Sequence, residues 1–344
     1  MTRKILIFIF VVMVVGGLVV GLLFRQWIWG PNITQGQNNY EFYVPTGSSS
    51  NDVFHKLVSE GFLINKKSYQ FVARSMHYNK DKVPPGKYLL EAGMSNRQLI
   101  SLLRTGKQTP VNITFNNVRF VEDLAGKISH YIEEDSLNII ELIKDQDFCQ
   151  QRGLDTNNIM SLFIPNTYEF FWNTSAIQLI RRMEKEHARF WQSEDRMSKA
   201  EKWGLSPSEV FSLASIVEKE TLVNSEKAAV AGVYLNRLQK GMLLQADPTV
   251  VYAVGDFSLR RVLRKHLKFD SPYNTYIHEG LPPGPICMPD VSTIDAVLNA
   301  EDHDYIYFCA KPEGGGRHAF AKTLRGHNRN AREYQSWLSS RNIR

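Results

Sequence analysis

Two glutamates, Glu218 and Glu220, stand at the charged end of the apolar segment SLASIVEKET (residues 212–221). The preceding SPSE (residues 206–209) is a capping box with proline at the first helical position, so a helix is predicted to begin there. At 100° per residue, the apolar side chains form one face of this helix, and the two glutamates fall on the two edges of that face. Either carboxyl group is therefore placed to be drawn partly into the interior.

A carboxyl group in an apolar environment holds its proton at neutral pH and can act as a general acid. The ordinary alternative is that both glutamates are solvated at the boundary of the helix face. Periodicity alone does not decide between Glu218 and Glu220.

Polar and aromatic residues gather in the segments that follow. The stretch from Asp270 to Ile286 is long, rich in Tyr, Asn and Thr, and punctuated by Pro and Gly, which is typical of a functional loop. The aromatic segment IPNTYEFFW (residues 164–172) suits either a sugar groove or core packing. The glycine run at 314–316 lacks the Lys-Ser/Thr of a phosphate loop, and the histidines from His266 onward lack metal-ligand spacing, so neither a nucleotide nor a metal site is expected.

Several motifs, in this order, resemble the MltG/YceG-like family of endolytic murein transglycosylases. They are ASIVEKET (214–221), YLNRL (234–238), LQADPTVVY (244–252), SPYNTY to GLPPGPI (271–286) and GRHAF to HN (316–328). The resemblance covers nearly all of the chain after its first apolar segment. The chain departs from the family pattern at Asn166, Asp290, Ala321 and Gly326.

The resemblance implies cleavage inside peptidoglycan glycan strands, at the bond from N-acetylmuramic acid (MurNAc) to N-acetylglucosamine (GlcNAc). The nucleophile would be the muramic C6 hydroxyl, so the new ends would be 1,6-anhydroMurNAc, and the cut would terminate nascent strand elongation. The resemblance also implies that Glu218 is the catalytic residue, acting first as acid and then as base. For that role we expect its pKa to lie above the ordinary value of about 4.3, because of the apolar residues around it.

The same resemblance suggests which residues hold the sugars, although each of them also has an ordinary structural interpretation, such as a turn at Asp247 or a loop closure at His318. The expected substrate-binding residues are Asn236, Gln245, Asp247, Tyr273, Asn274, Thr275, Tyr276, His318 and Phe320. No metal or cofactor is implied. The expected partners are glycan strands and a lipid bilayer, with peptidoglycan synthases as a candidate and no nucleic acid.

Two other functions stay open at this stage. The chain could be a membrane-anchored peptidoglycan-binding scaffold without activity, or a muramidase that uses water and a pair of carboxyl groups. The products distinguish them, since the three functions give anhydro ends, no cleavage, or reducing ends.

The N-terminal run from Ile5 to Phe24 is continuously apolar, and about 20 residues at roughly 1.5 Å each span a bilayer core. Trp27 and Trp29 follow where an interfacial aromatic belt belongs, which favours a retained anchor over the alternative of a cleaved signal peptide. Arg3 and Lys4 before the run favour a cytoplasmic N-terminus. We therefore expect a single-pass protein of the cell (inner) membrane, with its catalytic domain outside the cytoplasm.

The 344 residues carry a net charge of +6, which suits nucleic acid, anionic lipid or an anionic polymer equally. Three widely spaced cysteines indicate no disulfide framework. Alternating helix and strand patterns predict an α+β fold in which a small α/β subdomain, LysM-like by resemblance, precedes a larger mixed α+β catalytic domain. The expected parts are an anchor with its cytoplasmic stub (1–29), a polar linker (30–41), the LysM-like subdomain (42–109) and the YceG-like catalytic domain (110–344).

Overall fold

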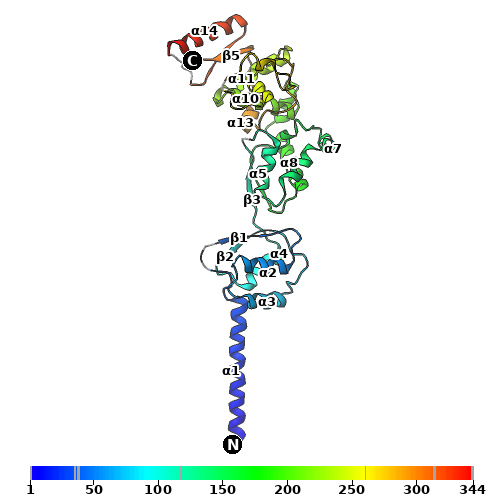
Figure 1. Ribbon diagram of the computed structural model, residues 1–344, viewed down its shortest axis with the longest axis vertical. Coiled ribbons are helices and arrows are strands. Elements are labelled where there is room, and N and C mark those ends of the chain that lie inside the picture. The colour runs from blue at the N-terminus through cyan, green and yellow to red at the C-terminus, as the bar shows by residue number, and fades with distance from the viewer. Residues whose placement is uncertain are drawn as a thin grey trace. The chain divides into compact units, whose positions relative to one another are not determined.

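The computed structural model describes residues 2–34, 36, 39–116, 118–259, 261–312 and 315–341. The chain is mixed α+β, as expected, and divides into two compact units (Figure 1). The first unit holds Met1–Asn112 with two short later segments, Tyr131–Glu133 and Glu169–Thr174. The second unit holds the remaining residues.

The first unit begins with α1 (Thr2–Trp29), a helix of 28 residues whose length is roughly 42 Å. It is the one helix in the described part of the chain that is long and apolar enough to cross a membrane, and its apolar side chains are exposed. The apolar helix expected from the sequence is thus present, and it continues past Phe24 to Trp29.

The rest of the first unit packs around one antiparallel strand pair. Its elements are β1 (Asn39–Val44), α2 (Ser50–Ser59), α3 (Lys66–Ser75), β2 (Gly86–Glu91) and α4 (Asn96–Thr105), with β1 paired to β2. Ser49, Asn65 and Ser95 cap the three short helices with their side chains. Asn32 and Ile33 are buried in this unit, so the segment 30–41, expected as a linker, contributes to its core.

The second unit is mostly helical. Its elements up to the central helix are α5 (Val121–Ser129), α6 (Ser136–Lys144), α7 (Gln146–Gln150), α8 (Ala176–Gln192), α9 (Arg196–Trp203) and α10 (Pro207–Glu220). The elements after it are α11 (Lys227–Gln239), α12 (Asp247–Val254), α13 (Val291–Leu298), β5 (Tyr307–Ala310), β6 (His318–Ala321) and α14 (Leu324–Ser340). Two further strands, β3 (Val111–Thr114) and β4 (Thr167–Phe170), each contribute residues to both units. β3 pairs with β4, and β5 pairs with β6 in antiparallel register. Tyr168 and Phe170 of β4 are buried, which favours the core-packing interpretation of the aromatic segment.

The helix that carries the two glutamates, α10, lies at the centre of the second unit. Its predicted capping box is present, with Ser206 and Glu209 bonded reciprocally and Pro207 in the first turn. It contacts α9, α11, α12 and α13, and every residue from Val210 to Val217 is buried. The expectation of a single apolar face is therefore wrong, because neighbouring elements cover this helix on all sides.

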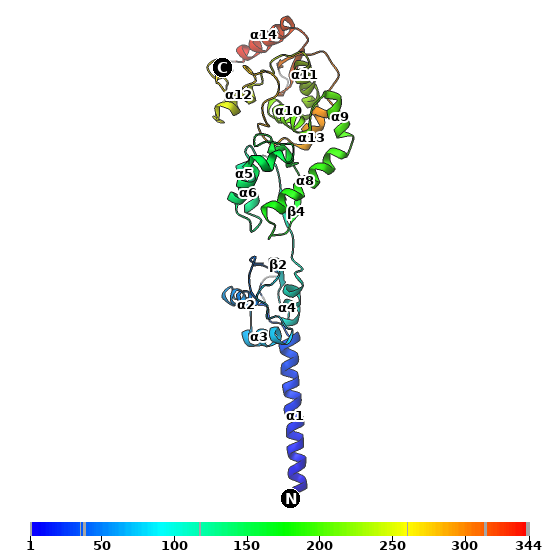
Figure 2. The ribbon, with the colours of Figure 1, turned by 90° about the vertical axis from the view of Figure 1, so that its right-hand side faces the viewer.

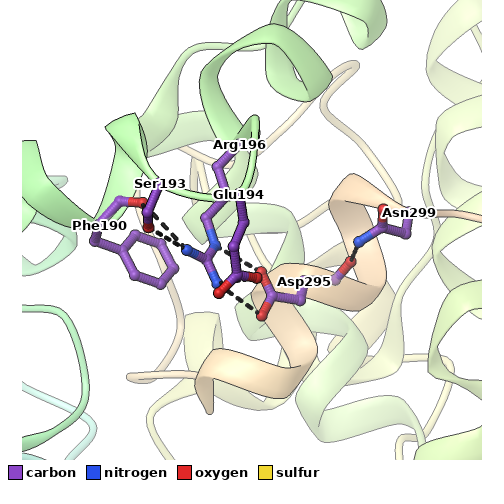
Figure 3. Close-up of polar contacts among 6 residues, drawn as sticks. All are labelled: Phe190, Ser193, Glu194, Arg196, Asp295 and Asn299. Carbon is purple, nitrogen blue, oxygen red and sulfur yellow. Dashed lines mark hydrogen bonds and ion pairs between the residues drawn. The ribbon is translucent and has the colours of Figure 1, made fainter.

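A buried arginine joins α9 to α13 (Figure 3). Arg196 is 5% exposed, and its guanidinium binds Asp295 through two nitrogen–oxygen contacts of 2.7 and 3.1 Å. The same group donates to the Ser193 hydroxyl at 2.7 Å and lies 4.1 Å from the centre of the Phe190 ring. This bidentate pair fixes α13 beside α9 in the framework that surrounds α10.

Replacing Arg196 by Ala should lower the free energy of unfolding by about 3 kcal/mol, because Asp295 would lose its partner in a largely buried site. Arg189→Ala is the matched control, since the Arg189 side chain is 80% exposed and lies 3.5 Å from Glu186; its effect should stay within about 0.5 kcal/mol. Urea unfolding of both variants measures the difference. Equal effects would show that the Arg196 pair does not hold the two helices together.

Candidate active site

A cavity of about 750 Å³ opens in the second unit at the C-terminal end of α10. Its size is that of an ordinary small-ligand site. It combines charged groups with an aromatic wall. The lining residues are Arg119, Lys219, Glu220, Asp247, Pro248, Val251, Tyr252, Phe257, Leu259, Arg261, Val262, Ile286 and Tyr334.

Glu220 is the last residue of α10 and lines this cavity. Its carboxylate accepts a hydrogen bond of 2.7 Å from the hydroxyl of Tyr234 on α11. Burial of the carboxyl group, helped by the negative charge of Asp247, raises the pKa of Glu220 to about 7. The Tyr234 bond and the charge of Arg237 offset only part of this rise. Glu220 is thus half-protonated near neutral pH.

Asp247 begins α12 and is the second carboxyl group in the cavity lining. Its Oδ1 atom accepts a hydrogen bond of 2.6 Å from the hydroxyl of Tyr276. Burial and the Asp247 interaction raise the pKa of Tyr276, which keeps this phenol a donor at neutral pH. Asp247 is exposed, and its carboxyl group lies in the same cavity lining as that of Glu220.

Glu218 lies in a different environment, away from the cavity lining. It forms an ion pair of 3.0 Å with Lys227, which is 3% exposed, and it accepts a short hydrogen bond from Thr293 on α13. Burial alone would raise the pKa of Glu218, but the bonds from Thr293 and Lys227 and the lysine charge hold it below its usual value. The expectation of a raised pKa at Glu218 is therefore wrong, since a buried cation faces this carboxylate.

Aromatic rings form one side of the cavity. The Tyr252 ring lies 4.7 Å from the Tyr273 ring and 5.7 Å from that of Phe120, measured between ring centres. Phe257 packs edge-on against Phe120, and the Arg119 guanidinium lies 3.6 Å from the centre of the Phe257 ring. Such a surface presents flat apolar faces next to cationic groups.

The expected binding residues between 245 and 276 fall around this cavity, but they differ in what they do. Asp247 lines the cavity, and Tyr273 and Tyr276 contact lining residues. Asn274 and Thr275 are buried; the Asn274 amide donates to two backbone carbonyls, and the Thr275 hydroxyl accepts from the Ala246 amide at 3.0 Å. These two residues therefore hold the loop in position.

Gln245 is exposed and has a φ of 51°, in the left-handed region that residues with a side chain rarely adopt. Its backbone amide donates to the Thr275 carbonyl at 3.0 Å. This bond ties the segment before α12 to the 270–286 loop, which contains neither helix nor strand, as the sequence indicated.

The remaining three expected binding residues take part in contacts outside the cavity lining. The Asn236 amide donates to the carbonyls of His303 and Tyr305, at 2.6 and 3.0 Å. His318 on β6 binds Glu226 at 3.0 Å, and Phe320 packs against the rings of His303 and Tyr305. The Asn236 contacts join α11 to the segment before β5. The His318 contact joins β6 to Glu226, the residue just before α11.

The sequence reasoning missed Tyr234, Arg119, Tyr252 and Phe257 as site residues. Tyr234 carried a usable signal, because it stands in the YLNRL motif (234–238) at the middle of a helix that follows the glutamates. A phenol buried in a helix needs a polar partner, and a nearby carboxyl group can supply one. Arg119, Tyr252 and Phe257 had no such local signal, since they meet only through the fold.

The family model for the YceG-like family matches residues 42–333, which is most of the chain. The chain belongs to the YceG-like family. This YceG-like chain is 29% identical to the endolytic murein transglycosylase of Bacillus subtilis (strain 168), over 96% of its own length and 92% of that protein. It is 25% identical to the endolytic murein transglycosylase of Streptococcus pneumoniae, over 85% of its own length and 57% of that longer protein.

A solved structure shares this fold. A YceG-like protein from Listeria monocytogenes is 28% identical and superposes with a TM-score of 0.55. The match covers 86% of this YceG-like chain and 99% of the Listeria chain.

The ion pair between Lys227 and Glu218 yields a stability prediction for this YceG-like chain. The depressed pKa of Glu218 adds stability above the ordinary carboxyl pKa of about 4.3, and this contribution is lost as the pH falls through the folded-state pKa. Lys227→Met should therefore cost about 3 kcal/mol at neutral pH and much less in acid, where Glu218 is protonated.

Lys219→Met, at an exposed neighbour on the same helix as Glu218, is the control and should have little effect at either pH. Urea unfolding of both variants at the two pH values gives the comparison. A Lys227→Met loss that is equally large in acid would show that packing, rather than charge, accounts for the role of Lys227.

Proposed function

We propose that this chain is a membrane-anchored endolytic murein transglycosylase that uses Glu220 as its general acid and base. Membership of the YceG-like family and the two relatives named endolytic murein transglycosylase support the activity. The observation that carries the residue assignment is a carboxyl group with a pKa of about 7 in the wall of a large cavity. A general acid works best when its pKa lies near the working pH.

The proposed reaction needs no water. Protonated Glu220 gives its proton to the oxygen of the bond from MurNAc to GlcNAc, and that bond breaks with the electron pair leaving on the GlcNAc oxygen. The MurNAc C6 hydroxyl then bonds to C1, and the Glu220 carboxylate removes the hydroxyl proton. The proton count balances, Glu220 returns to its starting state, and the strand carries a 1,6-anhydroMurNAc end.

The neighbouring groups suit the other needs of this reaction. Positive charge develops at C1 in an oxocarbenium-like transition state, and the carboxylate of Asp247 can stabilise it at close range. The Tyr276 hydroxyl, bonded to that carboxylate at 2.6 Å, fixes its orientation. The rings of Tyr252 and Phe257 offer flat surfaces for pyranose faces, and Arg119 offers a cation for carboxylates of the muramic acid stems.

A second carboxyl group in one cavity also gives a water-using muramidase a physical basis, because such enzymes pair an acid with a base or nucleophile. Reducing ends, rather than anhydro ends, would identify that reaction. A non-catalytic scaffold finds less support, since nothing in a binding role requires a carboxyl group whose pKa is raised to about 7.

The sequence resemblance assigned the catalytic role to Glu218, and the geometry favours moving it to Glu220. Lys227 and Thr293 hold the Glu218 carboxylate and its pKa is lowered, whereas the pKa of Glu220 is raised, so we propose Glu220 rather than Glu218 as the proton donor. The bonds of Glu218 to α11 and α13 instead fix the end of α10, where Glu220 stands. We therefore assign Glu218 a positioning role.

We also propose that α1 is a single-pass anchor with a cytoplasmic N-terminus, which would place both units outside the cytoplasm next to their wall substrate. The first unit, with its order β1–α2–α3–β2, would be a LysM-like module that holds glycan near the membrane. Ending nascent strands there is the proposed physiological role, with peptidoglycan synthases as candidate partners.

Glu220→Gln should abolish anhydro products, with a loss of at least about 10²–10⁴-fold, because the amide neither donates the acid proton nor accepts one. Mass spectrometry of digested glycan strands measures the product. In the wild type, kcat/KM should fall as the pH rises through about 7, because the free enzyme must begin with Glu220 protonated.

Glu218→Gln is the matched control on the same helix and should keep the anhydro product and the pH at which activity falls, although the variant will be less stable. If Glu218→Gln is inactive while folded and Glu220→Gln is active, Glu218 is the acid and our assignment fails.

A further inference from the structure

The C-terminal end of the membrane helix α1 is packed against the first unit. Figures 1 and 2 both show α3 beside the end of α1, and α1 contacts α3 and α4. The Phe71 ring on α3 lies 5.0 Å from the Phe24 ring and 5.6 Å from the Trp27 ring, measured between centres. The side-chain amide of Asn96, at the start of α4, donates to the Trp27 carbonyl at 2.9 Å. The unit is therefore fixed to the anchor at the level where the apolar run ends.

The outer side of α3 carries cations and apolar groups but no carboxylate. Tyr69, Val72 and Ala73 face the core, while Lys66, Lys67, Gln70, Phe71 and Arg74 are exposed. Phe71 is 37% exposed and Ile64, just before the helix, is 56% exposed. Arg25 on α1 and Arg97 on α4 add two more exposed cations beside these contacts. The sequence of α3 contains no acidic residue.

We propose that the face formed by Ile64, Lys66, Lys67, Phe71 and Arg74, called the α3 face below, lies on the membrane surface and binds anionic phospholipid headgroups. The inference rests on the proposed anchoring of the chain by α1. It adds a second membrane contact, made by the folded unit itself.

The depth of the α3 face follows from its contacts with α1. Phe24 is the last residue of the apolar run, and Trp27 lies one turn beyond, at the level of an interfacial aromatic belt. Because Phe71 touches both rings, it lies at the same level, among headgroups and the ends of the acyl chains. Aromatic and basic residues on one face of a helix are typical of helices that lie in the membrane interface.

Charge and continuity favour lipid over other occupants of this face. Cations within a Debye length of an anionic bilayer are attracted to it, and Lys66, Lys67 and Arg74 each contribute. The muramic acid stems of a glycan strand also carry carboxylates, but a strand in the wall would not reach the level of Phe24, where the α3 face lies. Docking through both α1 and the α3 face would hold the first unit in one orientation on the bilayer.

The test uses the full chain in lipid nanodiscs with a spin label at position 70, introduced as Gln70→Cys at an exposed position of α3 next to Phe71. Cys309→Ser removes the half-buried native thiol, and Cys149 and Cys287 are buried. The control label, Lys107→Cys, is exposed beyond the far end of α4, about 15 Å along that helix from Asn96. Collision rates with a water-soluble and a lipid-soluble relaxing agent report where each label lies.

In discs containing phosphatidylglycerol, the label at position 70 should be shielded from the aqueous agent and reached by the lipid-soluble one, whereas the label at 107 should be fully aqueous. Reversing the charges with Lys66→Glu, Lys67→Glu and Arg74→Glu should detach the α3 face from the bilayer. The ratio of chains with the face bound to chains with it free should fall roughly fivefold for each charge. The matched control reverses Lys80, Lys82 and Lys107 on the same unit and should leave the shielding intact.

Equal aqueous exposure at positions 70 and 107 in phosphatidylglycerol discs would overturn the proposal. Equal shielding of position 70 in discs of phosphatidylcholine alone would overturn the assignment to anionic headgroups. Failure of the chain to stay in discs at all would instead refute the α1 anchor, so the two failures are distinguishable.

Discussion

The constraint on which the site depends is the burial of one carboxyl group at the end of a helix whose middle turns have no exposed side. Residues from Val210 to Val217 are buried, and α10 ends at Glu220 in the wall of the cavity. Burial there raises the pKa of Glu220 to about 7. The hydrogen bond from the Tyr234 hydroxyl stabilises the carboxylate and so limits this rise. The role proposed for Glu220, in which it gives and takes a proton in one cycle, needs this balance.

The surrounding framework explains why the end of α10 stays in place. Lys227 and Thr293 bind Glu218 from α11 and α13, and Arg196 joins α13 to α9 through Asp295. Glu218 and Glu220, which are separated only by Lys219, therefore lie in different environments. The carboxylate that meets a buried cation has a lowered pKa, and the carboxyl group that meets a phenol and another carboxylate has a raised pKa. In other sites with two carboxyl groups, different environments likewise move the two pKa values apart, so that one group is protonated and the other ionised.

Much of the fold was predictable from local signals in the sequence. The apolar run over 5–24 and the capping box at Ser206 both depend on residues close in the chain, and both are present. The contrast between the environments of Glu218 and Glu220 was not predictable in the same way. It depends on Lys227, Thr293, Tyr234 and Asp247, which reach the two carboxyl groups only through packing of other helices. The burial of Asn274 and Thr275 and their contacts within the loop also follow only from the fold.

The central claim is that Glu220 stores a proton near neutral pH. Infrared difference spectroscopy of the full-length protein, recorded on both sides of pH about 7, reports the C=O band of a protonated carboxyl group directly and needs no substrate. We predict a protonated-carboxyl band that disappears as the pH rises through about 7, is absent in Glu220→Gln and persists in Glu218→Gln. A band that persists in Glu220→Gln and is absent in Glu218→Gln would contradict the account.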